Sequence, residues 1–250
     1  MVLVMANWVE AKVINIKWWN EKLFSIKVEA KLPPYKAGQF TKLAMTIKDK
    51  KIARAYSFVN APSSNHTHEF LLVTVEDGLL SPPLSQLSIG ETLLIAEQAT
   101  GFFTLDEVPK ASELWLLATG TAIGPFLAML NEQAIWQKFK QIILVHGVRK
   151  LDDLVYQDEI LSHCEAKELK YVPYISQESK HNYSVGRITH GLESGELFKF
   201  STHTTNPENS QFMLCGNPEM VKECTKILLE KGFARNRRAN PGHITVEQYW

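Results

Sequence analysis

Residues 114–130 contain a pattern in this chain that is suited to binding a phosphate group. Residues 114–118 form a short apolar run, which is typical of a strand buried on both faces. The turn Gly120-Thr121-Ala122-Ile123-Gly124-Pro125 follows, and from Ile123 onward the apolar residues recur at helical spacing. A glycine turn between a strand and a helix N-terminus presents free backbone N–H groups to an anion. The turn lacks the three glycines of the dinucleotide fingerprint, so an ordinary strand-to-helix turn is an equally good interpretation.

Two motifs in the first hundred residues are further candidates for phosphate binding. On a strand, Arg54 and Tyr56 of Arg54-Ala55-Tyr56-Ser57 share one face. A guanidinium binds phosphate oxygens with two parallel bonds, and a tyrosine ring offers a flat surface for stacking. Taken alone, the motif is more often a surface arginine beside a barrel tyrosine. Gly78-Leu79-Leu80-Ser81 is a glycine turn that leads into a helix start, which Ser81 is expected to cap.

Composition excludes several classes of protein. The 250 residues include 27 Lys and Arg and 27 Asp and Glu, so the net charge of zero gives no sign of a nucleic-acid binder. Cys164, Cys215 and Cys224 are widely spaced, which favours reduced thiols in a cytoplasm and argues against an iron–sulfur or zinc site. No apolar run approaches the length of a membrane span. We therefore expect a cytoplasmic protein that binds neither metal, nucleic acid nor membrane.

The first hundred residues have the pattern of an all-β domain. The expected strands are residues 8–18, 23–30, 40–47, 53–59, 70–75 and 92–96. Turn residues separate them, which predicts a closed antiparallel barrel, and residues 82–87 are the one helical segment expected here. The pattern is interrupted around Pro109, so we place one domain at residues 1–106 and a second at 107–250.

The second half alternates strands with helices, which predicts an α/β domain with a parallel sheet. After residues 114–118, the expected strands are residues 141–148, 169–175 and 211–215, and the expected helices are residues 151–166, 187–197 and 219–231. Residues 243–250 alternate and are expected to enter the sheet as an edge strand. In such a sheet, ligands bind at the carboxyl ends of the strands.

The order of the motifs resembles the ferredoxin–NADP⁺ reductase family. The motifs are Ala37-Gly38-Gln39-Phe40, Arg54-Ala55-Tyr56-Ser57, Gly78-Leu79-Leu80-Ser81, Gly120-Thr121-Ala122-Ile123-Gly124-Pro125 and Cys215-Gly216-Asn217-Pro218. Each motif is moderately specific, whereas five in this order are strongly so. The chain is most similar to the bacterial flavodoxin/ferredoxin reductase branch, whose chains end in Tyr-Trp as this one does at Tyr249-Trp250. The resemblance covers nearly the whole chain from Trp8.

The resemblance implies FAD as a cofactor and assigns residues to it. Arg54 would bind the FAD pyrophosphate, Tyr56 would stack on the isoalloxazine, and Ser57 would hydrogen-bond near flavin N5. Tyr249 would cover the isoalloxazine and Trp250 would stack on the adenine, while Thr121 would touch both the flavin and the nicotinamide. The remaining FAD-site residues implied are Ala55, Leu72, Val73, Thr74, Leu79, Leu80 and Ser81.

The resemblance also implies NADP(H) at the carboxyl edge of the parallel sheet. Cys215 would lie beside the nicotinamide and shape the geometry of hydride transfer without acting as a nucleophile, which makes Ser57, Cys215 and Tyr249 the candidate catalytic residues. A buried apolar role is the alternative for Cys215. The other implied contacts are Gly120, Gly124, Arg149, Gln177, Arg187, Gly216 and Asn217. Arg149 and Arg187 can pair with the 2′-phosphate, but Ser176-Gln177-Glu178 replaces the family's Ser-Arg-Glu, which puts the strength of NADPH preference in doubt.

The resemblance implies an enzyme that passes electrons between NADPH and a one-electron carrier, ferredoxin or flavodoxin. Arg235, Arg237 and Arg238 make the C-terminal region basic and could steer such an acidic carrier, although a run of this kind is usually only a solvated face. One alternative is an NAD(P)H-dependent reductase of flavin or small molecules. Another is a flavin electron-transfer subunit of a larger enzyme, whose related families carry a clustered-cysteine segment that this chain lacks.

Overall fold

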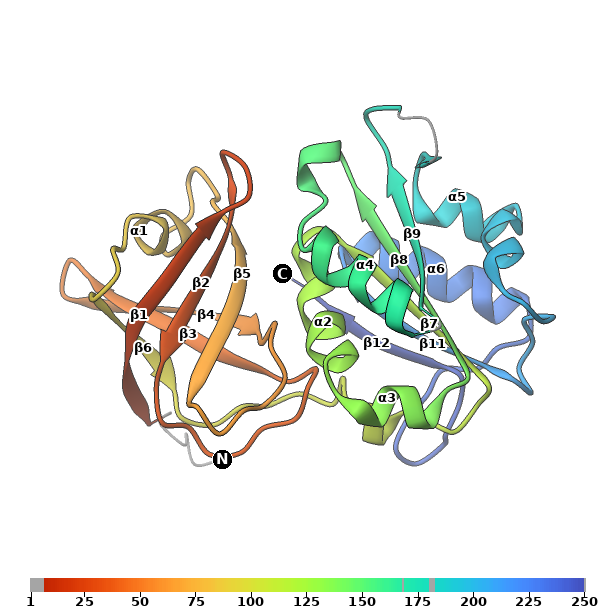
Figure 1. Cartoon of the computed structure of the whole chain (residues 1–250), viewed down its shortest axis with the longest axis horizontal. Coiled ribbons are helices and arrows are strands. Elements are labelled where there is room, and N and C mark those ends of the chain that lie inside the picture. The colour runs from red at the N-terminus through yellow and green to blue at the C-terminus, as the bar shows by residue number, and fades with distance from the viewer. Residues whose placement is uncertain (1–6, 168, 180–182, 250) are drawn as a thin grey trace.

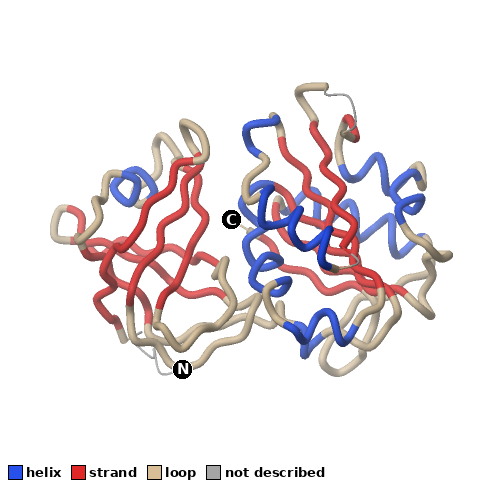
Figure 2. The backbone as a smooth tube through the Cα atoms, in the orientation of Figure 1, coloured by secondary structure: helices blue, strands red, loops and turns tan. Residues whose placement is uncertain are grey.

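The computed structural model describes residues 7–167, 169–179 and 183–249 and shows two sheets lying side by side (Figure 1). Strands β1 (Trp8–Trp18) to β6 (Thr92–Ala96) form the first sheet, and β7 (Glu113–Thr119) to β12 (Ile244–Gln248) form the second. Nearly all helical turns belong to the second half of the chain (Figure 2). In the described ranges no helix is both long and apolar enough to cross a membrane.

The first sheet is antiparallel and curled, as the sequence predicts. Its strand order is β4-β3-β6-β1-β2-β5, where β2 is Leu23–Glu29, β3 is Phe40–Ile47, β4 is Lys50–Ser57 and β5 is Thr67–Val73. The two outer strands meet where Phe58 pairs with Phe70, which curls the sheet around its apolar face. Phe24, Ile26, Leu43 and Phe70 fill this interior and are fully buried. The short helix α1 (Ser81–Ser85) lies between β5 and β6 in the chain.

The second sheet is parallel throughout and has the order β10-β9-β8-β7-β11-β12. The strands β8 (Gln141–Val148), β9 (Leu169–Ile175), β10 (Ser184–Val185) and β11 (Ser210–Gly216) complete it. The expectation that residues 243–250 add an edge strand is confirmed by β12, which pairs with β11.

Strand β7 is buried on both faces because helices cover both sides of the sheet. Leu114 and Leu116 pack with α2 (Gly124–Leu130), α3 (Gln133–Lys138) and α4 (Gln157–Ala166), whereas Trp115 and Leu117 pack with α5 (Ile188–Glu193) and α6 (Pro218–Glu230). Alternate side chains of a strand point to opposite faces, so an unbroken apolar run suits this central position.

Three expectations about helices were wrong in detail. Residues 151–166 form a 3₁₀ turn, Leu151–Asp153, and then α4, because Tyr156 adopts the left-handed conformation just before the helix (φ 56°). Residues 187–197 are divided between α5 and a 3₁₀ segment, Glu196–Phe200, with Gly195 left-handed between them. Ser81 does not cap α1, since its hydroxyl accepts a hydrogen bond from Val75 N at 2.9 Å instead.

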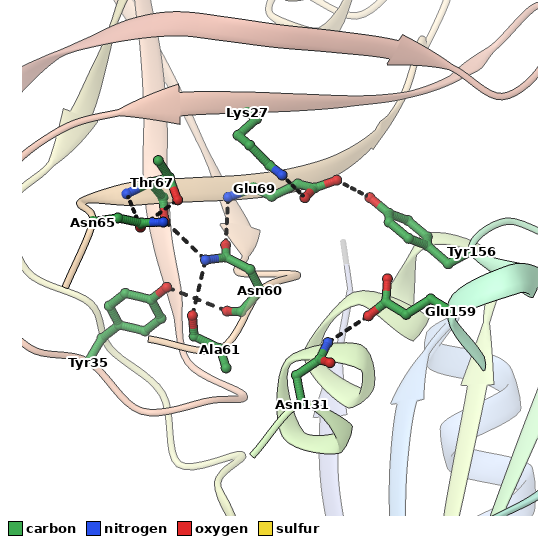
Figure 3. A network of polar contacts seen from close by, with 10 residues as sticks. All are labelled: Lys27, Tyr35, Asn60, Ala61, Asn65, Thr67, Glu69, Asn131, Tyr156 and Glu159. Carbon is green, nitrogen blue, oxygen red and sulfur yellow. Dashed lines mark hydrogen bonds and ion pairs between the residues drawn. The ribbon is translucent and has the colours of Figure 1, made fainter. Parts of the chain in front are cut away.

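Polar and aromatic contacts join the two halves of the molecule (Figure 3). The Tyr156 hydroxyl, at the start of α4, donates to Glu69 Oε1 of β5 at 2.7 Å, and Glu69 also forms an ion pair with Lys27 at 3.2 Å. The ring of Trp19 lies 4.5 Å from that of Tyr156. In addition, Asn20 Nδ2 donates to the carbonyl of Asp152 at 3.0 Å. The turn between β1 and β2 therefore contacts the loop that follows β8.

Candidate active site

Ser57, Cys215 and Tyr249 lie together where the two sheets meet. Ser57 ends β4 and is buried, and Cys215 is the penultimate residue of β11, with no exposed surface. Tyr249 follows β12, where its backbone N–H donates to Gly216 O at 3.0 Å. Its hydroxyl is close enough to the side chains of Ser57 and Cys215 for both to shift its pKa. Three residues that are far apart in the sequence thus lie together at one place.

The thiol of Cys215 and the phenol of Tyr249 both stay protonated at neutral pH. Burial raises the pKa of Cys215 well above its usual value, and the carboxyl of Glu247 raises it further. Burial likewise raises the pKa of Tyr249, with Cys215 adding to the shift. A protonated thiol is a poor nucleophile, so the raised pKa does not favour covalent catalysis at this sulfur.

Glu247 is a site residue that the sequence reasoning missed. It lies opposite Cys215 in the pairing of β12 with β11, and burial raises the pKa of its carboxyl to about 7. Its Oε2 is buried without a hydrogen-bond partner among the described residues. The sequence did hold one signal for Glu247. It lies two residues before Tyr249, and residues i and i+2 of an extended chain point to the same face, so a residue predicted for the site indicates its neighbour as well. Its raised pKa depends on the fold and has no counterpart in the sequence.

The turn after β7 lies at the carboxyl edge of the parallel sheet, between β8 and β11. Thr119 Oγ1 accepts a hydrogen bond from Asn217 N at 2.9 Å, and the side chain of Asn217 caps α6 by accepting from Glu219 N. Gly216 has a φ of 135°, and a Cβ there would lie 2.1 Å from Thr119 Oγ1, so only glycine fits. Thr121 is buried, and Gly124 begins α2 close to Val59, which follows β4 of the first sheet.

The predicted nicotinamide-nucleotide contacts beyond this turn lie along the same edge. Gln177 N donates to Arg149 O at 2.9 Å, which brings the ends of β9 and β8 together, and Arg187 is the N-cap residue of α5. The side chains of all three are exposed. Within the described ranges, neither Arg149 nor Arg187 forms an ion pair with a carboxylate. Glu178 accepts from Leu151 N at 2.8 Å and so joins the two loops.

Comparison with known proteins identifies the family. Two family models match: the oxidoreductase FAD-binding domain over residues 12–101 and the oxidoreductase NAD-binding domain over residues 116–226. The flavodoxin/ferredoxin–NADP reductase of Escherichia coli is 44% identical over 98% of this chain and 100% of that protein. The ferredoxin–NADP reductase of Azotobacter vinelandii is 30% identical, with 98% of each chain covered. The crystal structure of a ferredoxin NADP⁺ reductase from Neisseria gonorrhoeae with bound FAD and NADP matches with a TM-score of 0.92 at 31% identity, covering 98% of this chain and 100% of that one.

The chain belongs to the flavodoxin/ferredoxin–NADP reductase family. It is therefore an oxidoreductase, and the resemblance of its motifs is confirmed. The family models leave residues 102–115 unmatched, so a boundary between residues 106 and 107 stays a prediction.

The reductase's first sheet fits a dinucleotide with an anionic diphosphate. Arg54 is exposed on β4 and donates to its own neighbour, Ala53 O, at 2.8 Å, with no carboxylate paired to it in the described part of the chain. Tyr56 is half-buried on the same strand face. The Thr74 hydroxyl is buried and has no hydrogen-bond partner among the described residues. The exposed guanidinium can pair with phosphate oxygens, the tyrosine ring can stack on a flat group, and the unpaired hydroxyl can hydrogen-bond to a ligand.

The other residues predicted to bind this cofactor differ in how far their side chains are exposed. The side chains of Leu72 and Leu80 pack into the core of the first sheet, whereas Val73 is half-buried and Leu79 is 61% exposed. Ala55 is exposed, and Ser81 is committed to Val75 N as described above. Trp250 lies outside the described residues.

The three arginines of the reductase's basic region differ in their contacts. Arg238 forms an ion pair with Glu107 at 3.0 Å, and its guanidinium lies 3.7 Å from the ring centroid of Phe102, which is 59% exposed. Arg235 and Arg237 are exposed, and neither forms an ion pair in the described part of the chain. Arg235 also lines a groove between α6 and β12.

Proposed function

We propose that this chain transfers electrons between NADPH and a one-electron carrier, ferredoxin or flavodoxin, through a bound FAD. The observation that carries the proposal is the meeting of the side chains of Ser57, Cys215 and Tyr249, which brings the end of the FAD-domain strand β4 to the carboxyl edge of the NAD-binding sheet. Bound FAD supplies the redox chemistry, accepting two electrons together and releasing them singly.

The chain's own residues hold and orient the two cofactors. Arg54 neutralises the diphosphate of FAD, Tyr56 and Tyr249 flank its ring system, and Ser57 offers a hydroxyl beside it. Cys215 shapes the space for the nicotinamide and keeps its proton. Glu247 is half-protonated at about pH 7, so its Oε2 can release or take up a proton next to this group near neutral pH.

The function is tested by the absorption spectrum of the purified protein and by its carriers. We expect a flavin spectrum, and NADPH oxidation that ferredoxin or flavodoxin accelerates. An enzyme that reduces free flavin or small molecules faster than either carrier would contradict the proposal. Three unpaired cysteines support a cytoplasmic location, where thiols remain reduced.

We expect the enzyme to prefer NADPH over NADH through Arg149 and Arg187. Arg149→Ala should lower the ratio of kcat/KM for NADPH over NADH by about tenfold, because one charge-assisted hydrogen bond to an exposed phosphate is lost. The loss should appear mainly in KM, since a remote contact is made equally in ground and transition states. Gln177→Arg should raise the ratio by adding a cation. Steady-state kinetics with both nucleotides checks this, and an unchanged ratio in Arg149→Ala would place the phosphate elsewhere.

We also infer that Arg235, Arg237 and Arg238 steer an acidic carrier, with Arg237 the best test because its charge is unpaired. Arg237→Glu should slow reduction of the carrier roughly three- to tenfold at low ionic strength, and the difference should shrink as salt screens the charges. Lys140→Glu reverses the charge of another exposed residue, which lies just before β8 and outside the basic region, and serves as the matched control. Stopped-flow rates against salt concentration measure the effect. Equal losses with a small neutral acceptor would indicate structural damage and not docking.

A further inference from the structure

His146 is a fully buried histidine that lies beneath the turn after β7. It belongs to β8 and pairs in register with Ala118. Its Nε2 lies 3.0 Å from the carbonyl oxygen of Gly120, and its Nδ1 lies 3.4 Å from the hydroxyl of Tyr171 on β9. A carbonyl only accepts, so the ring proton is on Nε2, and Nδ1 accepts from the hydroxyl. The imidazole thus connects β9 to the turn through β8.

The turn is fixed on both sides by neighbouring strands. On the β11 side, Thr119 Oγ1 accepts from Asn217 N at 2.9 Å, and on the β8 side Gly120 O accepts from His146. Gly120 has a φ of 55°, and no atom lies within 4 Å of the position that a Cβ would take, so the turn faces open space there. Gly120 begins the 3₁₀ segment Gly120–Ile123, and glycine tolerates the positive φ at its start. The Nε2–H of His146 gives the carbonyl of Gly120 a partner from outside this short segment.

Burial keeps His146 neutral. It lowers the pKa of the imidazole to about 4, so above pH 5 the ring donates one proton and carries no charge. A neutral donor suits a fully buried site because an unpaired buried charge is strongly unfavourable. Burial also raises the pKa of Tyr171, whose hydroxyl therefore remains a donor.

From this geometry we infer that His146 is a positioning residue, whose Nε2–H holds the carbonyl of Gly120 and thereby fixes the orientation in which Gly120 and Thr121 meet the cofactor rings. The inference rests on the proposed function, because that function puts the turn against the flavin and nicotinamide. His146 acts through Gly120 and need not touch either cofactor. A rotated Gly120–Thr121 peptide would shift Thr121 and misalign the two rings.

Two substitutions separate the hydrogen bond from packing. His146→Leu fills the buried position with an apolar side chain of moderate size and removes the donor. His146→Gln places an amide N–H at a similar distance from the backbone, so that it can still donate to Gly120 O. In FAD-loaded protein, we expect His146→Leu to speed amide hydrogen exchange in the peptide that contains Thr119 to Gly124. We also expect its kcat with an artificial acceptor to fall roughly tenfold, because small misplacements of reacting groups are costly. His146→Gln should restore both, and binding of 2′-phospho-AMP should be unchanged in each.

Several outcomes would overturn the inference. The first is that His146→Leu has the same amide exchange rates and the same kcat as the wild type. The second is that exchange becomes faster throughout β8 and β9 and His146→Gln does not restore it, which would indicate a packing role. If His146→Leu does not fold, His146→Asn keeps a polar side chain too short to reach Gly120 O and should give the same local effects. Hydrogen exchange reports the bond even if the wild-type protein reduces no carrier, so failure of the proposed function would be seen separately.

Discussion

Arg54→Ala is expected to weaken FAD binding by roughly a hundredfold, because a guanidinium that binds phosphate oxygens contributes charge-assisted hydrogen bonds. Arg54 is exposed, and its side chain donates only to Ala53 O in the described structure, so removing it should leave the stability of the first sheet almost unchanged. The variant should purify pale and release flavin on dilution, which titration of flavin-free protein with FAD measures directly.

Lys50→Ala is the matched control for Arg54→Ala, since Lys50 lies on the same strand and the same face and is also exposed. We expect the control to retain its colour and its dissociation constant for FAD. A fully yellow Arg54→Ala protein with unchanged affinity would show that the diphosphate lies elsewhere. Loss of flavin from both variants would point to a general effect of charge.

Glu247→Gln should make the protein relatively more stable as the pH rises. In the folded protein the pKa of Glu247 is about 7, above its ordinary value of 4.5, so between these pH values the folded state holds a proton that the unfolded state has lost. The wild-type free energy of unfolding therefore falls as pH rises through this window, and glutamine abolishes that fall. After allowance for partial exposure, the advantage of the variant should grow by about 2 kcal/mol between pH 5 and pH 8.

Denaturant unfolding of flavin-free wild-type and Glu247→Gln proteins at several pH values measures this difference. Glu10→Gln, at an exposed position of β1, is the control for replacing a carboxyl by an amide on a strand. A constant difference between Glu247→Gln and wild type across the pH range would mean that the carboxyl is ionised throughout in the folded state. It would also remove Glu247 as a source of protons near neutral pH.

The sequence was sufficient where a pattern is local and repeated. Strand β7 could be predicted because residues 114–118 are an unbroken apolar run, and β12 because residues 243–250 alternate. The helix expected at residues 151–166 failed because its first residues are held by distant partners. Leu151 N donates to Glu178, and Asn20 in the turn between β1 and β2 donates to the carbonyl of Asp152. Such long-range contacts can outweigh a helical pattern of apolar residues, and the neighbouring sequence does not reveal them.

The candidate site was predictable through its motifs but not through its chemistry. Ser57, Cys215 and Tyr249 were named from the resemblance, and the structure brings them together. Glu247 and His146 were not named, because a carboxylate on a strand and a histidine in an apolar run look ordinary in sequence. Their altered pKa values arise from burial, which only the assembled fold provides.

The place of Tyr249 has a consequence for how the enzyme is made. Every residue of the first sheet leaves the ribosome before β12 is synthesised, and domains generally fold as units, the N-terminal one first. The first sheet can therefore form while the partner of Ser57 has not yet been translated. The contact between Ser57 and Tyr249 has to wait until β12 has paired with β11. Nascent or stalled chains thus lack the contact between Ser57 and Tyr249, which only a chain extended through β12 can make.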